Sequence, residues 1–301
     1  MVWDASAGQL TLFGGFYDNG TSDVYSDTWV APPAQPPSLI GGINDPELFP
    51  PLPGDEAQGL ASDATRLYIG YDDTITCDPH GNGHIDIVTP NGRIAGRRPT
   101  PAGCWHPNDI KYDPVSEELV VINTDVCYAT NEAACAAGCT AATLALAAWR
   151  LDARAGHFTN ALPSTPLTPA GWHLASIALD GDLIWRGIHS RPTGAFQLCA
   201  FDSSGQVQAT RVMSVYNPVQ GSLIRDGFFW LATSSDAGDV AIIDKYRIDL
   251  DPPRKVAHWA SAPATACLAE TEGITVFRDR LVYSAGLRCD PNGIDTRLHT
   301  V

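Results

Sequence analysis

Two stretches of the chain place tryptophan, histidine and small or polar residues directly ahead of an apolar run. The first reads CWHPNDI, from Cys104 to Ile110, and the second reads GWHLASI, from Gly171 to Ile177. Imidazole nitrogens act as general bases and bind borderline metals, whereas carboxylate and amide oxygens bind hard cations. Because the Trp-His pair recurs, we expect the chemistry to be spread over structural repeats.

Looser copies of the same pattern lie at residues 55–60, 217–222 and 270–274, and each precedes a further apolar run. The first apolar residue of the following strand is Leu10, Leu67, Leu119, Leu183, Phe228 and Leu281 in successive copies. The distances along the chain between these successive residues suit a four-stranded propeller blade of about 40–50 residues with insertions. The sequence is therefore interpreted as a repeat protein.

Alternating strands joined by polar turns fill the second half of each repeat, as in residues 85–94 and 196–207. No long window keeps a helical period. The pattern predicts an all-β protein, a six-bladed β-propeller of four-stranded antiparallel blades, with residues 1–301 as a single domain. The expected blades are residues 1–50, 56–100, 104–165, 172–214, 217–262 and 267–301.

The N-terminal 30 residues carry a second pattern. An apolar run ends at Gly14-Gly15, and an Asp-Thr-Trp strand follows at residues 27–29. The double glycine permits a turn where a side chain would clash, and the tryptophan can pack between blades. This stretch resembles one kelch repeat of bacterial type, which supports a propeller.

Composition limits the partners. The chain has 34 acidic and 19 basic residues and a net charge of −15, which argues against nucleic acid and anionic membranes. No apolar run approaches the roughly 18 residues of a membrane span. We therefore expect no nucleic-acid partner and no membrane span. The hydrolase hypothesis below adds a small-molecule substrate, and the sequence leaves the oligomeric state open, with a monomer as the default.

The eight cysteines favour an oxidising compartment and a set of disulfides. The expected location is secreted or periplasmic, after removal of a signal peptide. Spacing alone does not define the pairing. The considered bridges are Cys77 with Cys104, Cys267 with Cys289, and one within Cys127, Cys135 and Cys139, for which zinc binding is the alternative.

In a propeller the first strand of each blade lines the axial channel, so polar residues converge there from different repeats. The two ring positions hold Gln58, Asn108, Ala175, Gln220 and Glu272, and, two residues earlier, Glu56, His106, His173, Pro218 and Glu270. This collection of donors suits Ca²⁺, which takes six to eight oxygens. The histidines also admit zinc or another transition metal. The alternative is that these side chains only solvate the channel or satisfy strand ends.

The Glu-Gly, Asn-Asp and Gln-Gly pairs at these positions resemble those of the calcium-dependent six-bladed hydrolases. That family includes the gluconolactonase, senescence-marker, paraoxonase and diisopropylfluorophosphatase enzymes. The resemblance implies one calcium ion that polarises a lactone carbonyl or phosphoryl oxygen. Glu272 matches the family's Glu and Asn108 one of its Asn residues, while Gln58 and Gln220 stand where the family has Asn or Asp.

The resulting hypothesis is a metal-dependent hydrolase of lactones, esters or phosphotriesters. Its expected metal ligands are Glu56, Gln58, Asn108, Gln220, Glu270 and Glu272. Its expected catalytic residues are His106, His173 and Glu272, as general base or attacking carboxylate, and its substrate-binding residues are Trp105, Trp172 and His189. The competing hypothesis is a non-catalytic propeller that binds a glycan or a protein on its loop face. The kelch-like start and the proline-rich residues 31–54 favour that alternative.

Overall fold

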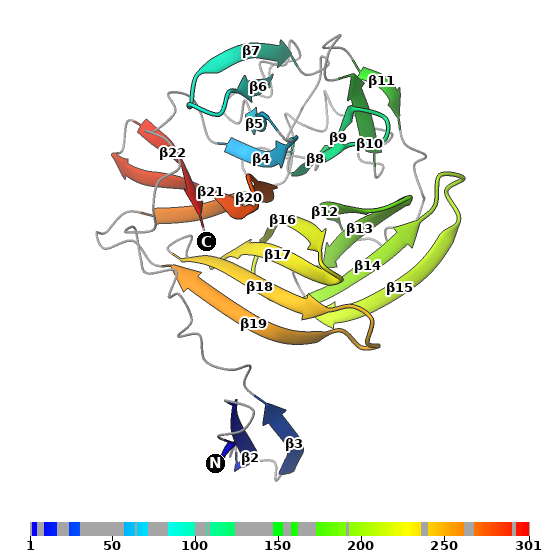
Figure 1. The fold of residues 1–301 in the computed structure, drawn as a ribbon, viewed down its shortest axis with the longest axis vertical. Helices are drawn as coiled ribbons and strands as arrows, with labels where there is room; N and C mark the ends of the chain where they lie inside the picture. The colour runs from blue at the N-terminus through cyan, green and yellow to red at the C-terminus, as the bar shows by residue number, and fades with distance from the viewer. Residues whose placement is uncertain are drawn as a thin grey trace. The chain divides into compact units, whose positions relative to one another are not determined.

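The computed structural model is built from antiparallel β-sheets, six of them in the described part of the chain (Figure 1). The described residues are 2–4, 9–16, 24–30, 57–63, 65–71, 84–99, 107, 109–123, 147–152, 158–161, 173–190, 193–235, 240–261, 268–290 and 293–300. None of these residues forms a helix, and hence none forms a helix that could cross a membrane.

The chain divides into two compact units, Met1–Gly41 and Gly42–Val301. The first unit holds the sheet β1-β2-β3, made of β1 (Val2–Asp4), β2 (Gln9–Phe16) and β3 (Val24–Val30). The register between β2 and β3 shifts at the double glycine, between Phe13 and Gly15. The single domain over residues 1–301 stays a prediction.

The second unit holds five sheets, each of which runs up and down in chain order, so that each is one blade. The first blade is β4 (Ala57–Ser62), β5 (Leu67–Tyr71), β6 (His84–Val88) and β7 (Ile94–Pro99). The second is β8 (Asp109–Asp113), β9 (Glu118–Asn123), β10 (Ala147–Asp152) and β11 (Phe158–Ala161). The third is β12 (His173–Asp180), β13 (Leu183–Ser190), β14 (Ala195–Phe201) and β15 (Val207–Ser214). The fourth is β16 (Val219–Arg225), β17 (Phe228–Ser234), β18 (Ala241–Arg247) and β19 (Arg254–Ser261), and the fifth is β20 (Leu268–Phe277), β21 (Arg280–Asp290) and β22 (Gly293–Thr300).

The first strands of these blades form a closed ring. Each contacts the first strand of the next blade, in the order β4, β8, β12, β16 and β20, and β20 contacts β4 again. The prediction of a propeller with antiparallel, mostly four-stranded blades is confirmed. Six blades are not confirmed, because the ring of described strands closes on five sheets, while the expected first blade contributes its described strands to the other compact unit.

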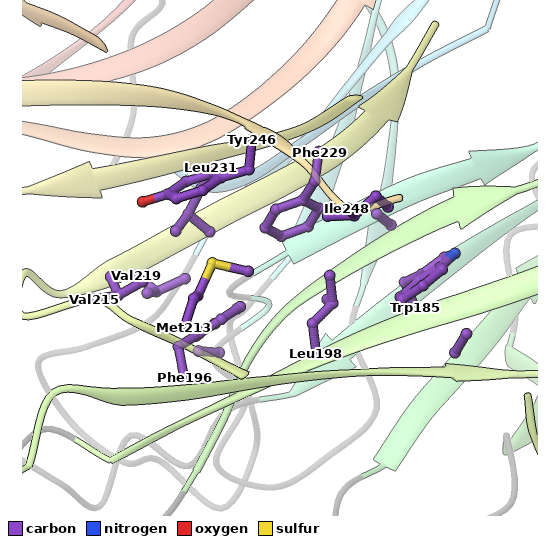
Figure 2. Close-up of a cluster of buried hydrophobic side chains, with 13 residues drawn as sticks. Trp185, Phe196, Leu198, Met213, Val215, Val219, Phe229, Leu231, Tyr246 and Ile248 are labelled. Atoms are coloured by element: carbon purple, nitrogen blue, oxygen red, sulfur yellow. The ribbon is translucent and has the colours of Figure 1, made fainter. Parts of the chain in front are cut away.

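Apolar side chains fill the spaces between successive blades at four of the seams that the structure describes. Figure 2 shows one such cluster, in which Trp185 and Leu198 of the third blade pack near Phe229 and Leu231 of the fourth. A similar seam joins the last blade to the first, where Phe277 belongs to the same cluster as residues 57, 60, 67, 69, 71 and 88. Burying one large side chain of this kind contributes roughly 1.5–3 kcal/mol. The seams therefore stabilise the ring as a whole.

A β-bulge interrupts four of the inner strands at the equivalent place. The register shifts leave one residue of each strand without an opposite partner, and these residues are Gln58, Ala175, Gln220 and Glu272. The residue after each bulge is small: Gly59, Ser176, Gly221 and Gly273. A Cβ at Gly59 would lie 2.6 Å from the Pro107 carbonyl oxygen, and one at Gly273 would lie 2.8 Å from the Leu60 nitrogen. Neighbouring inner strands thus approach too closely for a side chain.

One cysteine has a described side chain. Cys199 is buried in β14 and is a free thiol. The considered disulfide partners, and with them the zinc alternative, lie outside the described side chains.

Replacement of Gly273 by alanine tests the close approach at the ring. We expect Gly273→Ala to lower the free energy of unfolding by about 1–3 kcal/mol, because the added methyl must displace backbone atoms of β4. The control is Gly96→Ala in β7, where a Cβ meets only ordinary contacts at 3.6 Å or more. Urea unfolding compares the two, and equal effects would contradict the proposed crowding.

Candidate functional site at the inner strands

The four bulge residues lie at one level of the ring. Each sits on the innermost strand of its blade, and all four are buried: 4% of Gln58, 7% of Gln220 and 1% of Glu272 is exposed, and Ala175 is fully buried. A bulge re-aims a side chain relative to the regular alternation of the strand, and bulges are frequent next to active sites. Strands β4, β16 and β20 contact one another, so the polar bulge residues come from mutually neighbouring strands.

The remaining candidate residues are only partly within the described structure. Glu56, Trp105, His106, Asn108 and Trp172 lie outside the described residues. The backbones of His173 and Glu270 belong to β12 and β20, but their side chains lie outside the description. No catalytic geometry follows for these residues, and their roles stay predictions.

His189 lies in β13, opposite His173. Its ring is fully buried, and its Nε2 lies 2.7 Å from the carbonyl oxygen of Val215. The ring also lies near Phe196, with the ring centroids 6.2 Å apart. These contacts fix the end of β13 against the segment that leads to the fourth blade. The proposed substrate contact of His189 stays a prediction.

The donor set at the bulge level consists of oxygen ligands, with one carboxylate and two amides from Glu272, Gln58 and Gln220. Oxygen donors of this kind suit Ca²⁺ better than a transition metal. The described part of the chain contains no group of three or more His, Cys, Asp or Glu side chains that could hold a metal ion. Metal binding therefore stays a prediction.

Immediately after the bulge level, the second blade differs from the others. Asp109 occupies the place of the small residues 59, 176, 221 and 273, and it is fully buried. Its Oδ2 accepts hydrogen bonds from the backbone N–H of Ile177, at 2.9 Å, and of Ser222, at 3.1 Å. Its Oδ1 accepts the N–H of Ile110 at 3.0 Å. One carboxylate thus connects the inner strands of the second, third and fourth blades.

Lys111 forms an ion pair with Asp109, which we name the axial ion pair. Residues two apart in a strand point to the same side, so Asp109 and Lys111 share a side, while Ile110 packs in the cluster between the first and second blades. The Lys111 ammonium donates to Asp109 Oδ1, and it lies 2.9 Å from the Ile110 carbonyl oxygen and 3.4 Å from that of Ile274 in the fifth blade. The pair therefore links four of the five blades.

Burial sets the electrostatics of this pair. Loss of water around Asp109 raises the pKa of its carboxyl group from 3.8 to about 6, although the ammonium of Lys111 and the backbone N–H groups act in the opposite direction. Burial likewise lowers the pKa of Lys111, and the neighbouring carboxylate opposes that shift. Charged hydrogen bonds, roughly twice as strong as neutral ones, only partly offset the cost of burying the Asp109 carboxylate, since the net shift of its pKa is upward.

The sequence interpretation treated Asp109 only as part of an Asn-Asp pair and did not identify its role. A signal was present in the aligned repeats, because Asp109 is the one charged residue among four small ones. Lys111, two residues on, stands where the other blades have the uncharged residues Ala61, Ala178, Leu223 and Thr275. Together these departures from the repeat indicate a specific interaction at the axis.

Comparisons with known proteins bear on the fold. No model of a known protein family matches the chain, and no curated protein sequence matches it. The exo-β-1,3-galactanase of Phanerochaete chrysosporium has a TM-score of 0.56 and 13% identity over 83% of this chain and 60% of that one. The tail fibre of Staphylococcus aureus phage P68 has a TM-score of 0.57 and 12% identity over 85% and 52%. A GH43_1 enzyme from Xanthomonas citri has a TM-score of 0.52 and 10% identity over 85% and 90%.

At these identities the likeness shows a shared propeller fold. The GH43 glycoside hydrolases are five-bladed propellers, in agreement with the five sheets of the ring described here. The chain spans 60% or less of the length of the first two structures named. The expected membership of the gluconolactonase and paraoxonase family is not supported, because the similar structures are of other kinds and the described strands of the ring form five sheets.

A double-mutant cycle tests the axial ion pair. We expect Asp109→Asn and Lys111→Met each to lower the free energy of unfolding by about 3–5 kcal/mol, because each leaves a buried charge without its partner. The double variant should lose clearly less than the sum of the two, since it leaves neither charge behind. Urea unfolding measures all four proteins. Strict additivity would contradict a direct interaction.

The raised pKa of Asp109 also predicts a pH dependence. Between pH 3.8 and about 6 the folded chain holds this proton more tightly than the unfolded chain. The contribution of this group to stability is therefore fully present below pH 3.8 and is lost as the pH rises through about 6. We expect the stability of the wild type, relative to the double variant, to fall over this range in urea titrations. A relative stability that rises with pH would show that the ammonium and the N–H groups outweigh burial.

Proposed function

We propose that the chain is a hydrolase that acts on glycans, with its site at the bulge level of the axial channel. The observation that carries this proposal is the set of bulges, which gives three inner strands a buried polar side chain at the equivalent position: Gln58, Gln220 and Glu272. The fold likeness to GH43 enzymes, including an exo-β-1,3-galactanase, supports a glycosidic substrate.

Glu272 is the proposed acid or base. Glycoside hydrolysis generally uses two carboxyl groups, one that protonates the leaving oxygen and one that acts as base or nucleophile. Asp109 does not suit the second role, because its oxygens already accept three backbone N–H groups and an ammonium. Glu270, in the same strand as Glu272, and Glu56, directly before β4, are the proposed sources of the second carboxylate.

The two glutamines are proposed to orient the substrate. A primary amide donates two hydrogen bonds and accepts through its oxygen, which matches the hydroxyl groups of a sugar. The same oxygens, with Glu272, would hold an oxygen-preferring cation such as Ca²⁺. Such an ion would orient the substrate through its hydroxyl oxygens, because the charge that develops on the sugar ring in this reaction is positive. His106 and His173 are retained as the candidate general bases of this site.

A glycan-binding propeller without turnover is the second candidate. The specific observation in its favour is that Glu272 is the only carboxylate among the four bulge residues of the described strands. The likeness to a phage tail fibre is compatible with this candidate. A secreted or periplasmic location and a monomeric state complete both versions of the proposal.

Turnover by Glu272→Gln tests the proposal. The substrates are β-1,3-galactotriose and nitrophenyl β-galactoside, with gluconolactone, nitrophenyl acetate and a phosphotriester for the earlier hydrolase hypothesis. We expect glycoside hydrolysis by the wild type and a loss of about 10²–10⁴-fold in kcat/KM for the variant, the usual contribution of a general acid or base. Glu118→Gln, at the β8–β9 turn away from the bulges, is the matched control.

The outcomes separate the alternatives. Unchanged turnover by Glu272→Gln, or turnover of the lactone or esters alone, would contradict the glycosidase proposal. Binding of galactotriose without turnover would favour the binding propeller. Activity that is lost with a chelator and restored by Ca²⁺ would support the ion, and activity that ignores the chelator would remove the ion from the proposal.

A further inference from the structure

A group of aromatic side chains and one lysine lies on a single face of the fourth blade. Phe228 and Trp230 belong to β17, Lys245 to β18 and Trp259 to β19. Trp230 pairs with Lys245 across the strands, and Trp259 pairs with Ile243, two residues before Lys245. Because paired residues and residues two apart share a face, these four side chains form one surface, which we name the aromatic platform.

The platform is ordered by its own contacts. The rings of Trp230 and Trp259 stack with their centroids 5.2 Å apart and their planes at 16°. The Lys245 ammonium lies 3.8 Å from the centre of the Phe228 ring and 4.8 Å from that of Trp230. Stacking and cation–π contacts of this kind hold side chains in a fixed arrangement. The platform is thus a preformed surface.

Both faces of this blade take part in packing, but the platform itself stays partly exposed. On the platform's face, Ala232 and Ile243 are buried, and β17 and β18 contact β20 of the fifth blade. Phe229, Leu231 and Tyr246 point the other way and pack against the third blade (Figure 2). In the third blade, the tryptophan equivalent to Trp230 is Trp185, which is buried in that core. The four platform residues are only half-buried. The adjacent fifth sheet has three described strands, against four in each of the other blades.

The size and charge of the platform limit its partner. Three partly buried aromatic rings expose less than about 250 Å² together, well below the roughly 800 Å² per partner of a stable protein interface. The net charge of −15 disfavours nucleic acid and anionic membranes. A partner the size of one or two rings, with both an apolar face and polar edges, fits the platform best.

We propose that the aromatic platform is a second glycan-binding site, in which a pyranose ring stacks on the partly exposed indole of Trp259, beyond its stack with Trp230. The C–H face of such a ring is apolar, and its rim carries hydroxyl groups. Lys245 supplies donors for these hydroxyls, and Asp226, exposed on the β16–β17 turn and in electrostatic contact with Lys245, supplies acceptors. This site adjoins the β16–β17 turn, whereas the bulge at Gln220 lies near the other end of β16. It does not depend on the proposed hydrolysis.

Calorimetric titration tests the site. The probes are β-1,3-galactotriose, cellohexaose and chitohexaose, and the proteins carry Glu272→Gln so that no probe is consumed. We expect at least one probe to bind with a response in tryptophan fluorescence, Trp259→Ala to weaken that binding more than tenfold, and Lys245→Met to weaken it several-fold. Tyr216→Ala is the matched control, because Tyr216 is 72% exposed and lies outside the platform. Its affinity should equal that of the parent.

Three outcomes would overturn the inference: no binding of any probe, unchanged binding by Trp259→Ala, or an equal loss with Tyr216→Ala. Thermal melting of each variant shows whether the fold is retained, and Trp259→Phe, which keeps an aromatic face, should recover part of the affinity. The result is separable from the proposed function. Trp259-dependent binding without any glycoside turnover by the wild type would refute the hydrolase and leave this site in place.

Discussion

The carboxylate of Asp109 holds the centre of the ring together. It accepts backbone hydrogen bonds from two other blades, and its partner Lys111 reaches a carbonyl oxygen in a third. Among the described residues, the inner strands meet at the axis through direct contacts of this kind. An ionised group satisfies several backbone groups at once, and its burial is tolerated because every oxygen is occupied. Because Asp109 stands directly after the bulge position, its contacts also fix the inner strands at the level of the bulge residues.

The small residues around the axis follow from the same constraint. A carboxylate that reaches two neighbouring strands requires those strands to come close. A Cβ added at Gly221 would lie 3.5 Å from Asp109 Oδ1. Glycine or serine at the equivalent place of the other four blades provides this space. The ring is therefore asymmetric in its chemistry, with one charged residue surrounded by four small ones, although its backbone repeats five times.

The repeat, the antiparallel blades and the alignment of residues 58, 175, 220 and 272 could be predicted from the sequence, because each depends on local alternation and on spacing. The number of blades could not. Residues 1–30 have the strand pattern of a blade, and only the contact between β20 and β4 shows that the ring closes without them. The role of Asp109 was equally inaccessible to local patterns, since its partners Ile177 and Ser222 lie 68 and 113 residues away in the chain.

At a bulge, the type of side chain can change with little effect on the pairing of its strand. A bulged residue has no opposite partner in the strand ladder, so the regular cross-strand pairing does not fix the type of its side chain. The four positions already hold alanine, glutamine and glutamate on strands of the same geometry. Over evolutionary time, the ring can therefore exchange these residues and acquire new specificities while Asp109 and the small residues keep the scaffold unchanged.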